Sequence, residues 1–377
     1  MQLHEDRTVA DVTDKERIWE EFHRLVRFDA ESGSEASIAE YLREKLCALG
    51  LTVTQDAAGN LFGVLKGTTK GESVLFCSHM DTVSPGKGKR AILYPDGTIR
   101  SNGTTVLGAD DVAGLTAILE ALKVIQERKL DHPMIEVLFT TGEELYCHGS
   151  AKFDFSSVTS NDAYVLDLTG EIGTAAVAAP SILSLEITIK GRAAHAGFEP
   201  EAGVNALTIA ARGISGLDTG HVEADTTVNF GTISGGSGKN VVPAEVRITG
   251  EIRSMRHERA LSEAQHIREC FESEAAKLGG AVTVTVTEEI RAYRVPPESS
   301  VVRRFQDALR SLGYGEGKLV DTFGGSDNNR FHCAGLRGIV LACGMENVHT
   351  TAEYTNLNTL QKSAELTLRL MTMETRI

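Results

Sequence analysis

Seven histidine and carboxylate side chains occupy positions where they could bind metal ions. They are His79, Asp81, Asp110, Glu143, Glu144, Asp167 and His349. Nearly all of them follow an apolar segment that is typical of a strand, so we expect them to gather where strands end. Imidazole and carboxylate ligands without thiolates are typical of zinc, cobalt or manganese in hydrolytic centres. Because one ion needs fewer carboxylates, the set predicts two ions bridged by one carboxylate.

His79 and Asp81 lie at the end of an apolar segment, 74–83, that predicts a buried strand. Successive side chains of a strand point to opposite faces, so these two would project to the same side. One of them could then bind a metal ion while the other orients it. Alone, a His-x-Asp pair is weak evidence, because most histidines satisfy local hydrogen bonds. The remaining candidates strengthen it.

The acidic pairs Asp110-Asp111 and Glu143-Glu144 also have an ordinary explanation. Acidic residues often begin a solvent-exposed helix, where the helix dipole favours negative charge. Here the first pair begins a predicted helix and the second follows an apolar strand at 134–140. Their occurrence together with the other candidate ligands favours metal binding over the solvated helix start.

The composition argues against a polyanionic partner. The 377 residues include 38 Lys and Arg against 52 Asp and Glu, which gives a formal charge of −14. Because nucleic acids bind basic surfaces, we expect no nucleic-acid partner, and a metal cation or a small substrate fits better. The length also exceeds the size at which a single core usually stops growing, so two domains are expected.

The six cysteines indicate a reducing compartment. They are scattered and form no Cys-x-x-Cys pair, which suggests neither a disulfide framework nor a cysteine zinc site. Residues 1–7 are polar, and no apolar segment of signal-peptide length follows them. No window approaches the run of about 18 apolar residues that a membrane helix requires. We therefore expect a cytoplasmic protein without a membrane partner.

Strands and helices alternate in the first part of the chain. Helices are predicted at 14–30, at 34–49 and from 107 onward, strands at 51–54, 60–65, 74–83, 134–140 and 163–166, and a hairpin at 92–99 within a polar loop, 84–105. Alternating elements with polar side chains at the carboxyl ends of strands predict an open α/β sheet.

After Pro180 the pattern changes to β-α-β-β-α-β. Strands are predicted at 184–190, 226–233, 244–252 and 282–286, with helices at 204–217 and 257–278. This order is typical of a ferredoxin-like domain. The α/β pattern resumes with a segment at 301–312, strands at 318–322 and 338–343, and a final helix at 357–373. The prediction is therefore a catalytic domain at 1–179 and 294–377, with an inserted domain at 180–293.

Along essentially its whole length the chain resembles the co-catalytic zinc peptidases that include peptidase T, carboxypeptidase G and succinyl-diaminopimelate desuccinylase. The motifs, in the family's order, are Ser78 to Val83, Gly108 to Asp111, Thr141 to Glu144, Asp167, Gly191 to Gly197, Asn240 to Pro243, Gly250 to Ser254 and His349. Gly108 to Asp111 and Gly324 to Asp327 are most similar to the peptidase T branch. The resemblance implies a phosphorylase/hydrolase-like mixed sheet flanked by helices, with an inserted ferredoxin-like lid or dimerisation domain.

The resemblance also implies two divalent metal ions, with zinc as the first candidate and cobalt or manganese as alternatives. Asp110 would bridge them. His79 and Asp167 would hold one ion, and Glu144 and His349 the other. The peptide bond between Asp110 and Asp111 is often cis in this family.

Further roles are implied by the same resemblance. Glu143 would be the general base, and Asp81 would support His79 as a metal ligand. His195 would stabilise the oxyanion, while Asn240 and Arg253 would bind the carboxylate end of the substrate. Without the resemblance, His195 would be an ordinary loop histidine, and Arg253 could equally pair with a surface carboxylate. Several relatives form a symmetric dimer through the inserted domain, and their counterpart of His195 can reach the partner's active site. We therefore expect a homodimer.

The implied function is a dinuclear metal-dependent hydrolase of short peptides, a tripeptide aminopeptidase similar to peptidase T. An amidase that removes the acyl group from an N-acyl amino acid is the alternative within the enzyme class. A non-catalytic binding module is a third hypothesis, and the retention of Glu143 and of every candidate ligand argues against it.

Two other motifs are set aside. Residues 235–239 are similar to a phosphate-binding loop, but they lack its first glycine and are followed by Asn240 instead of Ser or Thr. No Gly-x-Ser-x-Gly motif of a serine esterase occurs. Cys147 is expected to be a small buried hydrophobic residue and not a nucleophile.

Overall fold

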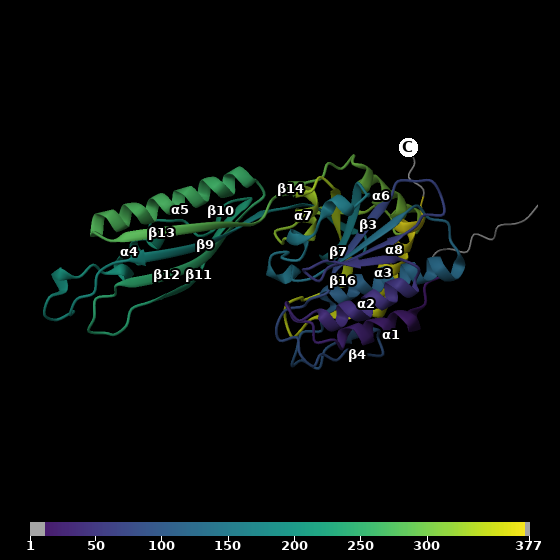
Figure 1. The fold of residues 1–377 in the computed structure, drawn as a ribbon, viewed down its shortest axis with the longest axis horizontal. Coiled ribbons are helices and arrows are strands. Elements are labelled where there is room, and N and C mark those ends of the chain that lie inside the picture. The colour runs from purple at the N-terminus through teal and green to yellow at the C-terminus, as the bar shows by residue number, and fades with distance from the viewer. Residues whose placement is uncertain (1–11, 374–377) are drawn as a thin grey trace, which may run out of the picture. The chain divides into compact units, whose positions relative to one another are not determined.

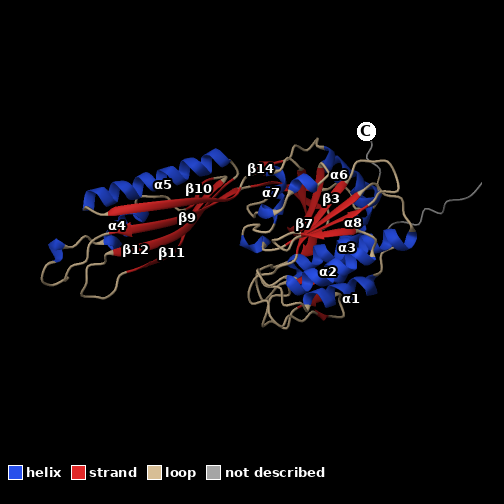
Figure 2. Ribbon diagram, viewed as in Figure 1, coloured by secondary structure: helices blue, strands red, loops and turns tan. Residues whose placement is uncertain are grey.

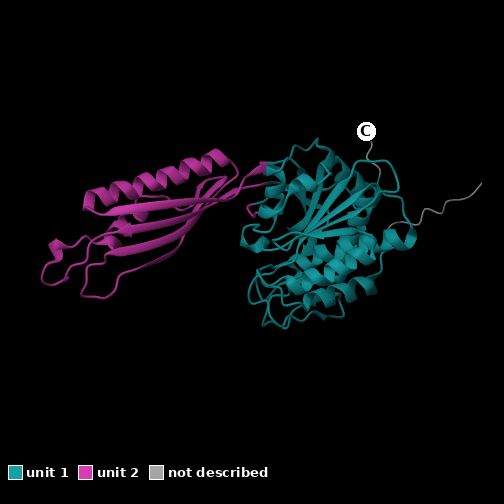
Figure 3. Cartoon of the chain, in the orientation of Figure 1, with its two compact units in different colours: residues 1–178, 294–322, 326–377 teal, residues 179–293, 323–325 magenta. Residues whose placement is uncertain are grey.

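The computed structural model describes residues 12–373. Residues 1–7, for which we expect no signal peptide, lie outside that range. The chain forms two compact units (Figure 3): unit 1 comprises residues 1–178, 294–322 and 326–377, and unit 2 comprises residues 179–293 and 323–325. Among the described residues no helix is long and apolar enough to cross a bilayer.

Unit 1 is built on a nine-stranded mixed sheet (Figure 1). The strand order is β1-β2-β6-β3-β7-β16-β8-β14, and β15 pairs with β8. The strands are β1 (Thr52–Gln55), β2 (Leu61–Leu65), β3 (Val74–His79), β6 (Ile135–Thr140), β7 (Asp162–Thr169), β8 (Thr174–Ala179), β14 (Tyr293–Arg294), β15 (Lys318–Asp321) and β16 (Arg337–Met345). A small second sheet has the order β17-β5-β4, formed by β17 (Tyr354–Asn356), β5 (Thr98–Arg100) and β4 (Ile92–Leu93).

The centre of the large sheet is parallel. β3 pairs in parallel with β6 and β7, and β16 pairs in parallel with β7. Every residue of β3 and of β6 is buried, which explains their continuous apolar sequences. The carboxyl ends of these four strands therefore meet at one edge of the sheet, where polar side chains of the following loops can converge.

Helices cover both faces of this sheet (Figure 2). They are α1 (Lys15–Val26), α2 (Ala36–Ala48), α3 (Ala109–Arg128), α6 (Ser300–Ser311), α7 (Asp327–Cys333) and α8 (Leu357–Thr372), with the 3₁₀ turns η2 (Glu143–Leu145), η3 (Ser150–Lys152) and η4 (Phe155–Ser157). α1 shows how the sequence sets such an element: Asp14 caps its first turn by accepting two backbone N–H groups, and Ile18, Phe22, Leu25 and Val26 form its buried face. On the opposite face of the sheet, Phe331 of α7 belongs to one buried apolar cluster with Leu75 and Cys77 of β3.

Unit 2 is a five-stranded antiparallel sheet with the order β10-β11-β12-β9-β13. Its strands are β9 (Ser181–Lys190), β10 (Gly220–Glu223), β11 (Thr226–Gly235), β12 (Glu245–Ser254) and β13 (Ala281–Ile290). The helices α4 (Ala206–Ser215) and α5 (His257–Leu278) pack on one face, where Ile209, Ile267 and Phe271 join a buried apolar cluster with the strands. This is the predicted ferredoxin-like arrangement with β10 added at one edge.

The mixed α/β fold class with an inserted ferredoxin-like unit is confirmed. Several predicted boundaries were wrong: the helix predicted at 14–30 ends at Val26, the strand predicted at 282–286 spans Ala281–Ile290, and the strand predicted at 74–83 ends at His79. From Thr82 the chain pairs with a different segment, through a bridge between Thr82 and Glu31. The elements β8, β10, β14, β17 and α7 have no counterpart in the prediction. The sequence of β8 is mostly alanine, which is depleted in strands and gives little signal for one.

Candidate metal centre

The predicted ligands of unit 1 converge at the carboxyl edge of its central strands. His79 is the last residue of β3, Glu143 and Glu144 follow β6, Asp167 lies in β7, and His349 follows β16. Since these four strands are neighbours and parallel, sequence segments far apart meet at one place. Two overlapping groups of side chains are close enough to hold an ion: His79, Asp110 and Glu144, and His79, Glu143 and Asp167.

The Asp110 carboxylate lies between two imidazole rings. Its Oδ1 atom is 3.0 Å from Nε2 of His79, and its Oδ2 atom is 3.1 Å from Nε2 of His349. Hydrogen bonds from both histidines lower the pKa of Asp110, against the effect of burial. The peptide bond between Asp110 and Asp111 is cis. A carboxylate that offers one oxygen to each of two histidines has the arrangement expected of a bridging ligand.

His79 is fully enclosed by acceptors. Its Nδ1 atom lies 3.0 Å from the carbonyl oxygen of Asp81 and 3.4 Å from the Asp81 carboxylate, and its Nε2 atom lies 3.9 Å from Asp167 Oδ1. Burial lowers the pKa of His79, but the contacts with Asp110 and Asp81 outweigh this and leave the pKa well above its ordinary value. The orientation of this ring is therefore fixed before any ligand binds.

Glu144 and His349 form the other side of the cluster. Glu144 Oε2 is 3.0 Å from His349 Nε2, and hydrogen bonds from His349 to Asp110 and Glu144 raise the pKa of the histidine to about 10. The second oxygen of Glu144, Oε1, is buried and has no hydrogen-bond partner among the described residues. A buried carboxylate oxygen is costly to leave unpaired, so this atom fits the role of a ligand to a cation.

Asp81 organises the loop after β6 as well as His79. Its carboxylate accepts the backbone N–H groups of Glu143 at 3.0 Å and Glu144 at 3.2 Å, and the hydroxyl of Ser32 at 2.7 Å. Burial raises the pKa of Asp81, but the hydrogen bonds, led by that of His79, hold it below its ordinary value. One carboxylate thus sets the relative positions of His79 and of both candidate glutamates.

Glu143 is buried next to the ligands. Burial raises its pKa well above the ordinary value, and the negative charges of Asp327 and Glu144 raise it further. Its Oε1 atom accepts a hydrogen bond from the Cys147 thiol at 3.5 Å. Burial of Cys147 raises the pKa of that thiol, which fits the expected small hydrophobic residue. Glu143 therefore lies inside the same buried cluster as the candidate ligands.

The cluster fits divalent metal ions. Its donors are imidazole nitrogens and carboxylate oxygens, which such ions prefer in hydrolytic centres. Carboxylates outnumber histidines, and burial together with neighbouring carboxylates raises the pKa of Asp167 well above its ordinary value. Bound cations would compensate this excess of negative charge and would pair with the free oxygen of Glu144.

Comparisons with known proteins agree with this chemistry. Residues 177–278 match the family described as Peptidase dimerisation domain, and residues 60–172 match Peptidase family M28. The uncharacterised protein YqjE of Bacillus subtilis is 37% identical over 96% of this chain and 99% of its own length. A crystal structure of a tripeptidase from Staphylococcus aureus has a TM-score of 0.92 at 35% identity, over 96% of this chain and 98% of that chain. The aminopeptidase PepT from Bacillus cereus has a TM-score of 0.89 at 36% identity, over 96% and 99%.

The chain belongs to the metallopeptidase family that includes peptidase T. The family resemblance found in the sequence is thereby confirmed, and so is the prediction that the chain is a metallopeptidase.

Two further carboxylates, Glu353 and Glu35, support the metallopeptidase site and were not predicted from the sequence. Glu353, only 1% exposed, accepts the backbone N–H of Gly108 at 2.7 Å and of Asp110 at 3.0 Å, and burial raises its pKa to about 7. Glu35 accepts the backbone N–H of Gly142 at 3.0 Å, next to Glu143. Glu353 ends the short polar segment that begins with His349. Its position in the sequence does not distinguish a buried residue that supports the site from a surface glutamate.

His195 and Asn240 of the metallopeptidase lie on adjacent loops of unit 2. The Ala196 N–H donates to the Asn240 carbonyl oxygen at 3.0 Å, and His195 forms a backbone bridge with Val241. The His195 ring is exposed and stacks on Phe198, with 4.2 Å between ring centroids. These two residues are thus brought together.

Arg253 lies at the other end of unit 2. It follows Glu245, the first residue of β12, by eight residues, a separation of roughly 26 Å along an extended strand. Its guanidinium makes a bidentate pair with Glu251, at 2.8 and 3.2 Å, and donates to the Phe323 carbonyl oxygen at 2.9 Å. Within unit 2, Arg253 is therefore separated from His195 and Asn240.

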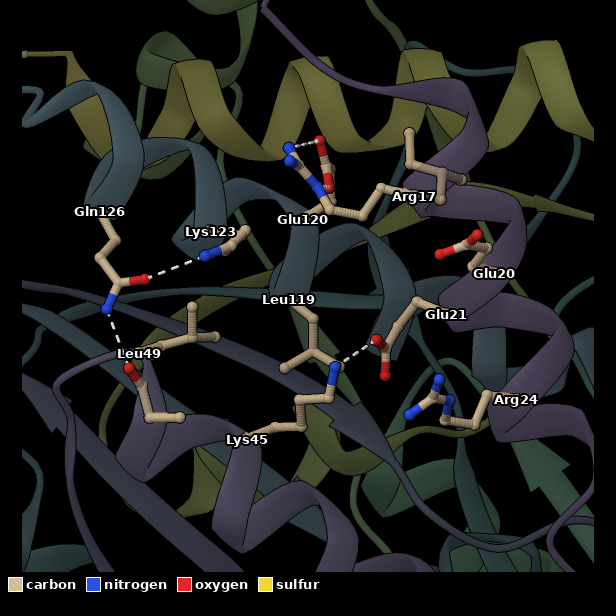
Figure 4. A pocket seen from close by; sticks show the side chains of 12 residues that line it. Arg17, Glu20, Glu21, Arg24, Lys45, Leu49, Leu119, Glu120, Lys123 and Gln126 are labelled. Atoms are coloured by element: carbon tan, nitrogen blue, oxygen red, sulfur yellow. Dashed lines mark hydrogen bonds and ion pairs between the residues drawn. The ribbon is translucent and has the colours of Figure 1, made fainter.

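A pocket of about 340 Å³ between α1, α2 and α3 carries no comparable chemistry (Figure 4). Figure 4 shows two ion pairs across it, which measure 2.6 Å between Arg17 and Glu120 and 2.7 Å between Lys45 and Glu21. These contacts tie the three helices together, so we assign the pocket a structural role.

Proposed function

We propose that the protein is a two-metal aminopeptidase that hydrolyses short peptides, with tripeptides as the first candidate substrates. The observation that carries the proposal is the Asp110 carboxylate, whose two oxygens face His79 and His349. The similar chains described as a tripeptidase and as aminopeptidase PepT support the substrate class.

Asp110 would be shared by both ions. His79 and Asp167 would complete one ligand set, and Glu144 and His349 the other. Divalent ions bound here, zinc first, would supply the positive charge that lowers the pKa of a water molecule and polarises the scissile carbonyl.

The residues of the chain supply the proton transfers and the positioning. Glu143 would take the proton of the attacking water and deliver it to the leaving nitrogen, as general base and then general acid. Asp81 would keep this carboxylate in place, because it holds the Glu143 and Glu144 N–H groups while it orients His79. His195 would donate a hydrogen bond to the developing oxyanion. Asn240 and Arg253 would bind the substrate carboxylate.

We also propose a homodimer formed through unit 2, which these last roles require. A tripeptide spans only about 10 Å, whereas Arg253 lies roughly 26 Å along β12 from the end of unit 2 that carries His195 and Asn240. One copy of unit 2 therefore cannot place all three residues around one small substrate. Two copies could share a site between them, and residues 177–278 match a peptidase dimerisation domain. We assign the protein to the cytoplasm.

A metal analysis combined with a hydrolysis screen tests the proposal. We expect two divalent ions per chain and the fastest turnover with tripeptides that carry a free amino terminus. Preferential turnover of N-acylated amino acids would instead establish the amidase. Full metal occupancy without hydrolysis of any di-, tri- or N-acylated substrate would indicate a binding module.

A further inference from the structure

A buried carboxylate beneath the metal centre has no role in the proposed reaction. Asp327, the first residue of α7, is 1% exposed and lies on the face of the sheet opposite α3. Its partners are two hydroxyl groups and a thiol: Ser150 donates to Oδ1 at 2.5 Å, Thr140 donates to Oδ2 at 2.5 Å, and Cys77 Sγ lies 3.7 Å from Oδ2. Burial raises the pKa of Asp327, and the Ser150 and Thr140 hydroxyls partly offset that effect.

The three donors come from the segments that carry the metal centre. Cys77 precedes His79 by two residues on β3, and Thr140 ends β6. Thr140 and Ser150 flank the segment 141–149, which contains Glu143 and Glu144. Backbone hydrogen bonds close the base of this segment, from Gly149 N–H to the Thr141 carbonyl and from His148 N–H to the Gly142 carbonyl. Asp327 therefore binds both ends of the loop that presents the two glutamates.

A carboxylate suits this position better than its amide. It accepts at both oxygens, whereas an asparagine would offer one acceptor and would turn an NH₂ group toward a hydroxyl. Burying a carboxylate lowers the stability of the folded protein unless donors surround it. For a residue that only packs, an apolar side chain would be more stable here. The three donors supply that environment.

We propose that Asp327 is a positioning residue that clamps the 141–149 loop and so holds the Glu143 carboxylate in its working position. This inference rests on the proposed role of Glu143 as the base. It assigns Asp327 no contact with metal or substrate.

The test compares Asp327→Asn with Glu136→Gln. Glu136 is a matched control, since it too is a buried carboxylate, 1% exposed, although it lies on β6. It holds another loop by accepting the Thr159 and Ser160 N–H groups, both at 2.8 Å. Hydrogen exchange of the full-length protein reports on each loop without reference to activity. We expect exchange to accelerate at least about 10-fold in 141–150 for Asp327→Asn, and near 159–160 for Glu136→Gln.

Kinetics separate positioning from general stability. With two ions still bound, Asp327→Asn should lower kcat about 10- to 100-fold, because a displacement of about 1 Å can cost that much, while KM changes by less than about threefold. Glu136→Gln should leave kcat within about twofold of the native value. If Asp327→Asn loses kcat only because it loses metal, the proposal is overturned. Unchanged kcat or unchanged exchange in 141–150 of Asp327→Asn would also overturn it. So would an equal loss of kcat in Glu136→Gln.

Two milder variants decide the matter if Asp327→Asn does not fold. Thr140→Val and Ser150→Ala each remove one donor, and each should lower kcat severalfold with metal retained. Native kcat and exchange in both would overturn the clamp. Glu143→Gln, measured in parallel, tests the role of Glu143 as the base separately from the role of Asp327. If Glu143→Gln retains native turnover, the proposed base is wrong. The exchange measurements still show whether Asp327 holds the 141–149 loop.

Discussion

The candidate residues of unit 1 and those of unit 2 are held in opposite ways. In unit 1, His79, Asp110 and Glu144 are largely buried, contact one another or His349, and carry more negative charge than the histidines compensate. In unit 2, His195 is exposed on a loop and Arg253 is already paired with Glu251. A site for cations must be built before they bind, since their ligands have to be fixed and desolvated together. Groups that bind a substrate reversibly must stay accessible to solvent, and they form hydrogen bonds or ion pairs with neighbouring residues when no substrate is bound.

The largest expected effect comes from removing the metal. Dialysis against a chelator should abolish peptide hydrolysis and leave the protein folded, because both units have apolar cores that do not depend on the ligands, unlike a zinc finger. Activity and circular dichroism, measured before and after metal is restored, check this. Full activity with metal shown to be absent would contradict the two-metal mechanism.

The next largest effect should separate the neighbouring glutamates of unit 1. Glu143→Ala should lower kcat about 10²–10⁴-fold with both ions retained, because it removes proton transfer but no ligand. Glu144→Ala should lower the metal content toward one ion per chain. Metal titration and kcat measured on both variants decide between the roles, and loss of metal in Glu143→Ala would show that they are reversed.

In unit 2, His195→Ala should lower kcat about 10²–10³-fold, the usual effect of losing an oxyanion donor, without changing the metal content. His266→Ala, at another exposed histidine of unit 2, is the control and should change neither kcat nor the metal content. If the site is shared between partners, mixing His195→Ala chains with Glu143→Ala chains should restore activity. A strictly monomeric enzyme with native activity would refute the shared site.

The smallest effect is expected at Arg253. Arg253→Ala should raise KM about 10-fold for tripeptides with a free carboxylate and change kcat less, since one charged hydrogen-bonding partner is lost. Amidated peptides should bind both forms alike. Arg247→Ala is a control, because Arg247 lies on the same strand and also pairs with a glutamate two residues before it, Glu245, through a single hydrogen bond at 2.9 Å. Equal KM changes for the free and amidated peptides would show that Arg253 does not bind the carboxylate.

The sequence alone determined the elements and the candidate ligands. Apolar periodicity located the long helices and the buried strands, because burial of one helix face or of a whole strand leaves a direct pattern in the sequence. The types of residue at strand ends indicated metal chemistry before any contact was known. The order of the motifs then indicated the family.

Only the tertiary structure decided which side chains meet. The parallel order β6-β3-β7-β16 brings His79, Asp167 and His349 together, and no local pattern encodes strand order. No spacing marks Glu353, and the motif that ends in Asp327 does not reveal the partners of that carboxylate. Both carboxylates accept hydrogen bonds from backbone N–H or hydroxyl donors in distant segments. Sequence periodicity reports whether a residue is buried, whereas hydrogen-bonding partners are set by long-range packing.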